Sequence, residues 1–210
     1  MIILDFGSGN SCHNDKTIVK KMLDELKKVD TGKHEIVIKW QLFKEAGKNI
    51  PLEHDIFKYA YDYAKKLGYQ TTSSVFDKES LDFLLQFDIP FVKIANNRSL
   101  DWLMGEIPRK IPIYVSYGSV DELKIAPQEN IKRLLCISDY PADIKSYEDV
   151  FDIDFYTHFE YGISDHTTNF GLWYRYQPQF IEWHYVLEHD KNNLDGGLFA
   201  HTPKQLSEVL

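Results

Sequence analysis

The sequence predicts an α/β protein whose eight parallel strands and connecting helices close into one compact (β/α)8 barrel, a TIM barrel. Eight short apolar or β-branched segments run through the 210 residues, and amphipathic segments separate them. Alternating strands and helices imply parallel pairing, and eight repeats imply closure into a barrel. No glycine-rich phosphate fingerprint follows any strand, which weakens the alternative of an open nucleotide-binding sheet.

The elements follow in order along the chain. Strands are expected at residues 2–6, 35–41, 70–76, 91–96, 111–116, 133–138, a segment ending at 164–166, and 180–186. Helices are expected at 17–29, 52–67, 78–87, 99–107, 128–131 and 144–150, with the aromatic run 170–176 packing as a seventh. Gly68 should end the second helix, and Thr202 with Pro203 should open the last one as N-cap and first residue.

Composition bounds the class of protein. The chain is 43% hydrophobic and 27% charged, as in a soluble globular protein, and we expect one domain over residues 1–210. It shows no apolar run of membrane-spanning length and no basic leader, which favours a cytoplasmic protein without a membrane partner. The net charge of −8 argues against nucleic acid as a partner. Cys12 and Cys136 are expected to be free thiols.

Polar side chains gather where the predicted strands end. Chemistry in such a barrel lies at the carboxyl ends of the strands, so these residues are candidates for one shared site. In chain order they are Asp5, Lys39, Gln41, Ser74, Lys93, Asn96, Ser116, Ser138, Tyr140, Ser164, His166, Glu182 and His184. Asp195, followed by two glycines, is expected in a loop that carries an acid over the mouth; an ordinary turn is the alternative.

Lys39 and Lys93 each interrupt a strongly apolar strand. A buried amine costs several kcal/mol unless it meets an anion. A phosphate or carboxylate ligand would compensate that cost, with the neighbouring serine hydroxyls completing the shell. The alternative is an internal pair between a lysine and a carboxylate such as Asp5 or Glu182.

His166 and His184 stand at two matched strand ends, each two residues beyond another polar residue. Strand alternation places Ser164 with His166 on one face and Glu182 with His184 on one face. Two imidazoles that converge could hold a divalent metal, whereas a partly buried histidine that donates a hydrogen bond is the simpler interpretation. The remaining histidines have no comparable spacing and are expected on the surface or in loops.

Six stretches together resemble the sialic acid synthase family, the barrels that condense phosphoenolpyruvate with an N-acetylated aldose such as N-acetylmannosamine. The stretches are residues 38–43, 74–84, 90–95, 135–141, 162–167 and 181–185, in the order in which the family has them. The Ser-Asp-His-Thr segment at 164–167 and the Glu-x-His segment at 182–184 are the most specific.

The resemblance implies a role for each candidate. His166 and His184 would bind a divalent metal, Mn²⁺ by preference, with Gln41 near its water. The phosphate and carboxylate of phosphoenolpyruvate would be held by Lys39, Ser74, Lys93, Ser116, Ser138 and Ser164, with Asn96 beside them. Tyr140, Glu182 and Asp195 would face the sugar, and Asp5 occupies the acidic position of the first strand. A homodimer is compatible with the family.

Three departures from the family bear on function. The first strand ends in Asp5 where the family has a longer acid and a following histidine, Asn96 replaces a serine, and a Ser-Tyr-Gly replaces the usual Ser-Thr-Gly at 116–118. The sequence is also expected to lack the family's small C-terminal antifreeze-like domain. Two alternatives therefore stay open: a non-catalytic barrel that binds a sugar or an anion, and a barrel metallohydrolase that acts on phosphoesters.

Overall fold

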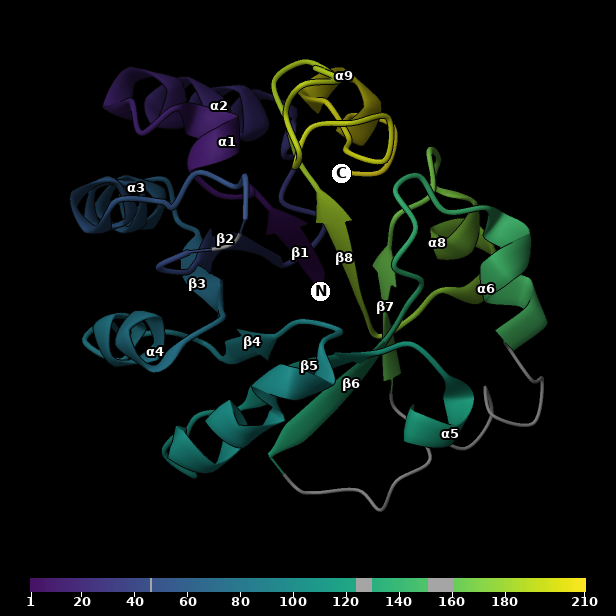
Figure 1. The fold of residues 1–210 in the computed structure, drawn as a ribbon. Coiled ribbons are helices and arrows are strands. Elements are labelled where there is room, and N and C mark those ends of the chain that lie inside the picture. Colours follow the sequence, from purple (N-terminus) through teal and green to yellow (C-terminus); the bar gives the residue numbers. More distant parts are fainter. Residues whose placement is uncertain (46, 124–129, 151–160) are drawn as a thin grey trace.

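The chain forms a closed parallel barrel with helices around it, seen in the computed structural model, which describes residues 1–45, 47–123, 130–150 and 161–210 (Figure 1). Each strand pairs with the next one in sequence, and β8 pairs with β1. The strands are β1 (Ile2–Asp5), β2 (Ile36–Leu42), β3 (Gln70–Val75), β4 (Val92–Ile94), β5 (Ile113–Tyr117), β6 (Ile131–Cys136), β7 (Tyr161–Asp165) and β8 (Phe180–His184). The predicted (β/α)8 barrel is confirmed.

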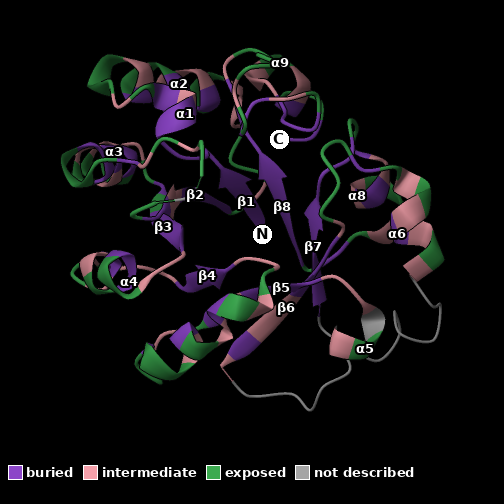
Figure 2. Cartoon of the chain, viewed as in Figure 1, coloured by how far each residue is buried: buried purple, intermediate pink, exposed green. Residues whose placement is uncertain are grey.

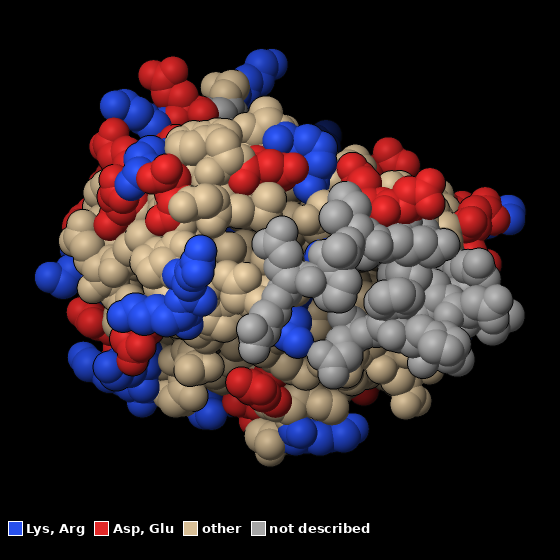
Figure 3. Space-filling view, turned by 90° about the horizontal axis from the view of Figure 1, so that it is seen from below, with Lys and Arg blue, Asp and Glu red and all other residues tan. Residues whose placement is uncertain are grey.

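Helices surround the strands and cover their outer faces (Figure 1). They are α1 (Gly9–Cys12), α2 (Lys16–Val29), α3 (His54–Lys66), α4 (Lys78–Leu84), the 3₁₀ helix η1 (Arg98–Glu106), α5 (Val120–Leu123), α6 (Ile144–Val150), α8 (Gly171–Tyr176) and α9 (Pro203–Leu206). Figure 2 shows buried strands inside helices whose outer faces are exposed. On the face in Figure 3, acidic and basic residues are interspersed.

Apolar side chains fill the amino-terminal half of the barrel interior. Ile3, Val37 and Phe91 form one buried cluster, against which Tyr114 packs with its ring 4.0 Å from that of Phe91. At Gly162 an added Cβ would lie 2.1 Å from the ring of Phe180, so only glycine leaves room for that ring. This apolar floor leaves the interior positions nearer the carboxyl ends for polar groups.

The polar residues occur two positions after the floor residues on the same strands. Asp5, Lys39, Lys93 and Ser116 follow Ile3, Val37, Phe91 and Tyr114 in this way, and Ser164 and Glu182 follow Gly162 and Phe180. Because side chains alternate along a strand, both sets face the barrel interior. The interior of the barrel therefore has an apolar layer toward the amino ends of the strands and a polar layer next to it, toward the carboxyl ends.

Most of the observed element boundaries lie close to those predicted from the sequence. Helix α6 has the predicted bounds, Gly68 follows α3 with a φ of +91°, and Thr202 caps α9 in a capping box with Pro203 at the start. The short helix expected at 128–131 is wrong at its end, because Ile131 begins β6; residues 128 and 129 lie outside the described residues. Helices α1 and α5 were not predicted.

Smaller expectations also have outcomes. Cys12 and Cys136 are free and buried, as predicted. His201 lies in the loop after β8, which agrees with a loop position, but it is not at the surface: it is fully buried, pairs with Tyr185 in an isolated β-bridge and stacks on Phe170. His158 lies outside the described residues. Among the described helices, none is both long and apolar enough for a bilayer crossing.

Candidate functional site

A cavity of about 410 Å³ opens among the residues at the carboxyl ends of the strands. All eight strands or the loops that follow them contribute to its wall. The wall includes all fourteen residues that the sequence singled out: Asp5, Lys39, Gln41, Ser74, Lys93, Asn96, Ser116, Ser138, Tyr140, Ser164, His166, Glu182, His184 and Asp195. The structure thus brings the whole predicted set together, whatever chemistry that set performs.

Asp5 and Lys39 form a buried ion pair on neighbouring strands. The β1–β2 register aligns the two residues, and the Lys39 Nζ lies 2.6 Å from Asp5 Oδ2 and donates to Ser74 Oγ at 3.0 Å. Burial alone would raise the pKa of Asp5, but the Lys39 ammonium outweighs it and lowers that pKa to about 2. For Lys39, the internal lysine–carboxylate pair is therefore what the structure contains.

The buried amine of Lys93 lies farther from a carboxylate than that of Lys39 does. Its Nζ donates to Ser116 Oγ at 2.7 Å and to the Ile94 carbonyl at 3.1 Å, while Glu182 Oε2 lies 3.9 Å away. The side chain is only 2% exposed, and this burial lowers the pKa of Lys93. An anion placed beside this amine would replace the solvation that burial removes.

Glu182 has one satisfied and one unsatisfied oxygen. Ser164 Oγ donates to its Oε1 at 3.0 Å, and the β7–β8 register aligns the two residues. Its buried Oε2 accepts no hydrogen bond from the described residues. Burial would raise the pKa of Glu182, but Lys39 and Lys93 outweigh it and lower that pKa. A carboxylate with a spare acceptor at the cavity wall suits a ligand hydroxyl.

Three further contacts connect the strand ends around Lys93. Arg98 Nη2 donates to the Ser116 carbonyl at 2.5 Å, and its guanidinium lies 4.4 Å from the centre of the Tyr117 ring. Across the cavity wall, Asn96 Nδ2 donates to Ser138 Oγ at 3.0 Å. Asn96 thus lies among the serines, as its sequence position predicted.

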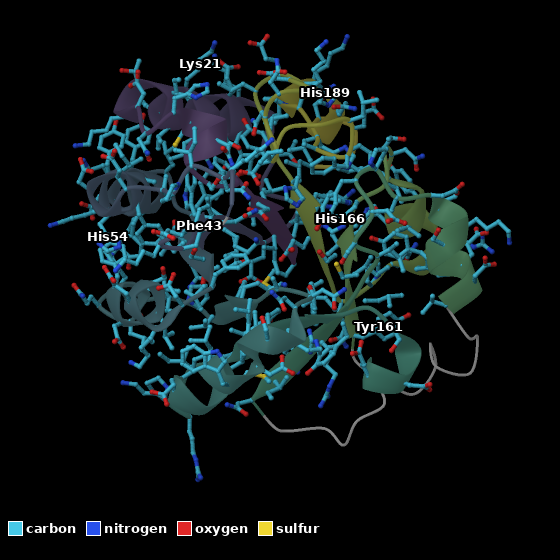
Figure 4. The ribbon with its side chains drawn as sticks, in the orientation of Figure 1. Lys21, Phe43, His54, Tyr161, His166 and His189 are labelled. Atoms are coloured by element: carbon cyan, nitrogen blue, oxygen red, sulfur yellow. The ribbon has the colours of Figure 1, made fainter. Side chains whose placement is uncertain are left out.

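His166 and His184 lie with ring centres 5.4 Å apart. His166 Nδ1 is 2.7 Å from the Ile137 carbonyl, which can only accept, so Nδ1 carries the proton and Nε2 keeps a free lone pair. Burial lowers the pKa of His166 to about 3, so its ring is neutral at neutral pH. Figure 4 places His166 near the barrel interior and His54 and His189 at the periphery.

His184 lies beside the carboxylate of Asp5. Its Nε2 is 3.7 Å from Asp5 Oδ2, and its buried Nδ1 has no hydrogen-bond partner within the part of the chain that the structure describes. The Tyr140 ring is 4.3 Å from that of His166, and the Phe199 ring is 4.9 Å from that of His184. Each of the two imidazoles thus packs against an aromatic ring on one side.

These residues fit a divalent metal only in part. Within the described ranges, no three His, Cys, Asp or Glu side chains gather as a metal site. Two imidazoles, one with a lone pair at Nε2 and one with a buried nitrogen that has no hydrogen-bond partner among the described residues, nevertheless suit a transition metal such as Mn²⁺. Water or substrate oxygens would complete its coordination.

Asp195 reaches the cavity from the loop after β8, as predicted. Ser8 holds its Oδ2 through both its backbone N–H, at 2.9 Å, and its hydroxyl, at 2.8 Å. Gln41 Nε2 lies 3.3 Å from Asp195 Oδ1 and 3.0 Å from Asp5 Oδ2. Gly7 has a φ of +74°, and a Cβ there would lie 2.6 Å from Asp195 Oδ2, so glycine is required.

Several residues at the cavity were not predicted: Asn49, Cys136 and Leu194 also line it. Phe76, which the sequence places with Ser74 at the end of the third strand, lines it as well. Cys136 carried a usable signal, since it is two residues from the predicted Ser138 at the same strand end. Asn49 belongs to the loop after β2, where no strand alternation applies.

A closed parallel barrel with buried lysines, serine hydroxyls and two imidazoles at the carboxyl ends of its strands defines the class: a (β/α)8 barrel with a candidate anion site beside a candidate metal site. The NeuB family profile matches residues 13–210, and the chain belongs to the NeuB family. Members of this family are phosphoenolpyruvate-condensing synthases that use a divalent metal. The resemblance inferred from sequence is confirmed at this level.

Individual relatives are distant. N-acetylneuraminate-9-phosphate synthase from Mus musculus is 27% identical over 122 residues, which cover 53% of this chain and 33% of that protein. The Drosophila melanogaster protein of the same name is 27% identical over 116 residues, covering 49% and 31%. The chain thus matches about a third of the length of these relatives.

Solved structures agree on the fold. The N-acetylneuraminic acid synthetase of Leptospira borgpetersenii, solved in complex with citrate, has a TM-score of 0.76 and 19% identity, covering 99% of this chain and 80% of that one. The spore coat polysaccharide biosynthesis protein SpsE of Bacillus subtilis has a TM-score of 0.74 and 19% identity, covering 99% and 65%.

Proposed function

We propose that the protein catalyses a metal-dependent condensation of phosphoenolpyruvate with an N-acetylated aldose, giving a sialic-acid-type 2-keto sugar acid. The observation that carries the proposal is Lys93. Its buried amine has hydroxyl and carbonyl partners and a carboxylate no nearer than 3.9 Å, and it shares one cavity with the paired imidazoles.

Phosphoenolpyruvate suits the lysine side of the cavity. Its phosphate and carboxylate would be held by Lys93 and Lys39 together with the hydroxyls of Ser74, Ser116, Ser138 and Ser164. Lys39 would then share its ammonium between Asp5 and the ligand, which three N–H donors permit. Such a double grip would orient the three-carbon chain with C3 toward the acceptor.

The acceptor sugar suits the opposite side. His166 and His184 would hold Mn²⁺, and a metal held there would supply a Lewis acid for the aldehyde oxygen of the open-chain sugar. The spare Oε2 of Glu182 and the carboxylate of Asp195 would accept hydrogen bonds from sugar hydroxyls. The ring of Tyr140, which is 54% exposed, would cover the sugar at the mouth.

The proposed reaction balances without an oxidant or reductant. C3 of phosphoenolpyruvate bonds to the aldehyde carbon, whose oxygen becomes a hydroxyl. Water adds at C2 and the C2–phosphate bond is lost, so that inorganic phosphate leaves and a ketone remains. One phosphoenolpyruvate, one aldose and one water thus give one phosphate and a 2-keto acid three carbons longer.

A second candidate is a barrel that binds a sugar or an anion without condensing it. Two observations favour it: Lys39 is already engaged by Asp5, and the described residues supply no complete set of metal ligands. Phosphoester hydrolysis by a metal-dependent barrel is a third outcome that the same assay separates.

The test is phosphate release from phosphoenolpyruvate with Mn²⁺ and a panel of N-acetylated and simple aldoses. We expect release that requires both the metal and an aldose, that chelation abolishes, and that His184→Ala removes while His54→Ala, on the outer helix α3, does not. Release without an aldose would indicate a phosphoester hydrolase. No release with any aldose, despite binding of phosphoenolpyruvate, would favour the non-catalytic barrel.

A further inference from the structure

Tyr147 lies on α6, outside the cavity, yet its hydroxyl contacts the backbone of two strand ends. The side chain is fully buried. The hydroxyl donates to the Ser164 carbonyl at 2.6 Å and accepts from the His166 N–H at 3.2 Å and the Ile137 N–H at 3.4 Å. One donor and two acceptor positions are the full capacity of a tyrosine hydroxyl.

These three backbone groups lie where the ladder between β6 and β7 stops. The last paired residues of the two strands are Cys136 and Ser164. Beyond them, the phenol supplies the partners that a continuing ladder would have supplied. Without it, the buried Ser164 carbonyl and His166 N–H and the partly buried Ile137 N–H would lose this partner.

The separation of the strand ends leaves the Ile137 carbonyl available to a side chain. That carbonyl lies 2.7 Å from His166 Nδ1 and fixes the ring as the Nδ1–H tautomer. The His166 backbone is held on its other side as well, because its carbonyl accepts from the Ala142 N–H at 2.9 Å. Tyr147 therefore contacts the backbone of both Ile137 and His166, the two residues whose contact leaves Nε2 of His166 without a proton.

We propose that Tyr147 is a positioning residue, whose hydroxyl keeps the ends of β6 and β7 apart so that the Ile137 carbonyl orients His166 with Nε2 toward the cavity. The use of that nitrogen for a metal rests on the proposed function. The orientation of the ring does not, and it can be measured separately.

The variant Tyr147→Phe removes the hydroxyl and keeps the buried ring. Tyr69→Phe is the matched control, because Tyr69 is also a buried tyrosine with a hydrogen-bonded hydroxyl, given to Asp30 at 2.8 Å and remote from the cavity. Histidine-selective ¹⁵N NMR at neutral pH, without metal, should show His166 as the Nδ1–H tautomer in the wild type and in the control Tyr69→Phe. In Tyr147→Phe we expect a mixture of tautomers.

Mn²⁺ titration by calorimetry is the second readout. Loss of a group that orients a metal ligand typically weakens metal binding about 10–100-fold, and we expect about tenfold for Tyr147→Phe and less than twofold for Tyr69→Phe. Incorporation of 4-aminophenylalanine at position 147 restores an N–H donor to the Ser164 carbonyl and should recover part of the loss. The same 4-aminophenylalanine variant can be compared with the wild type if Tyr147→Phe does not fold.

The outcomes separate the two proposals. A wild-type protein that binds no Mn²⁺ but shows the tautomer change on Tyr147→Phe would defeat the metal site and retain the positioning role. A Tyr147→Phe protein that melts earlier than the wild type, yet keeps the tautomer of His166 and its Mn²⁺ affinity within twofold, would overturn the positioning role and leave Tyr147 as a core residue.

Discussion

Replacement of Lys93 by methionine separates ligand binding from folding. Methionine keeps most of the volume of the buried side chain and removes its ammonium. In the folded protein the amine has two neutral partners, Ser116 Oγ at 2.7 Å and the Ile94 carbonyl at 3.1 Å, and burial lowers its pKa. The charge is thus costly for the empty protein and favourable for one that holds an anion.

The magnitude follows from the charge that is lost. Two unit charges 4 Å apart interact by about 4 kcal/mol at an effective dielectric of about 20, and a charge-assisted hydrogen bond contributes about 1.5–3 kcal/mol. We take about 3 kcal/mol as the net loss for the ligand, which weakens binding of phosphoenolpyruvate about a hundredfold. The free energy of unfolding should change by less than about 2 kcal/mol, because the methionine packs where the amine was buried.

Calorimetric titration with phosphoenolpyruvate and urea unfolding measure the two quantities on the same preparations. Lys20→Met is the control, since Lys20 is half exposed on α2 and pairs with Asp24. Binding of phosphoenolpyruvate by Lys93→Met within fivefold of the wild type would show that Lys93 does not hold the ligand. A loss of more than about 3 kcal/mol of unfolding free energy, the range expected when a buried ion pair is broken, would show that Lys93 stabilises the ligand-free protein.

Three further predictions concern stability. Asp5→Asn leaves the buried Lys39 ammonium without its carboxylate, so urea unfolding should show a loss of about 3–5 kcal/mol; an unchanged midpoint would contradict the pair. Gly7→Ala places a Cβ 2.6 Å from Asp195 Oδ2 at a φ of +74°. The melting temperature should therefore fall by several degrees, which corresponds to a loss of more than about 1 kcal/mol of unfolding free energy. Burial alone would raise the pKa of Asp30, but hydrogen bonds from a backbone amide, a tyrosine and a lysine lower it. The stability that ionised Asp30 contributes to the fold is therefore complete above its unfolded pKa of about 3.9, and it is lost as pH falls through the lower folded pKa. Asp30→Asn should therefore cost stability at pH 6 and progressively less below pH 4, and a pH-independent difference would rule this out.

The barrel and most of its cavity could be predicted because both depend on a period of two. In a closed parallel barrel every strand alternates between interior and helix-facing positions, so a polar residue near the end of an apolar strand has one place to lie. Lys39 and Lys93 are recognisable for this reason. The same rule placed His166 and Glu182 in the cavity wall.

What could not be predicted depends on contacts between distant segments. The pairing of Lys39 with Asp5 rather than Glu182 is set by the β1–β2 register. Tyr147 reads as an ordinary apolar position of a short helix, and its hydroxyl acquires a role only where two strands separate. His201 carried no spacing signal because its burial follows from stacking on Phe170, which depends on the folded loop after β8.

The most direct test of the central claim is the fate of C3 of phosphoenolpyruvate. The protein is incubated with [3-¹³C]phosphoenolpyruvate, Mn²⁺ and N-acetylmannosamine, or other aldoses in turn, and followed by ¹³C NMR. If the protein is a condensing synthase, the vinyl carbon becomes the saturated CH₂ of a 3-deoxy-2-keto acid as phosphate appears in equal amount. A labelled methyl group of pyruvate, or unchanged phosphoenolpyruvate with every aldose, would contradict it.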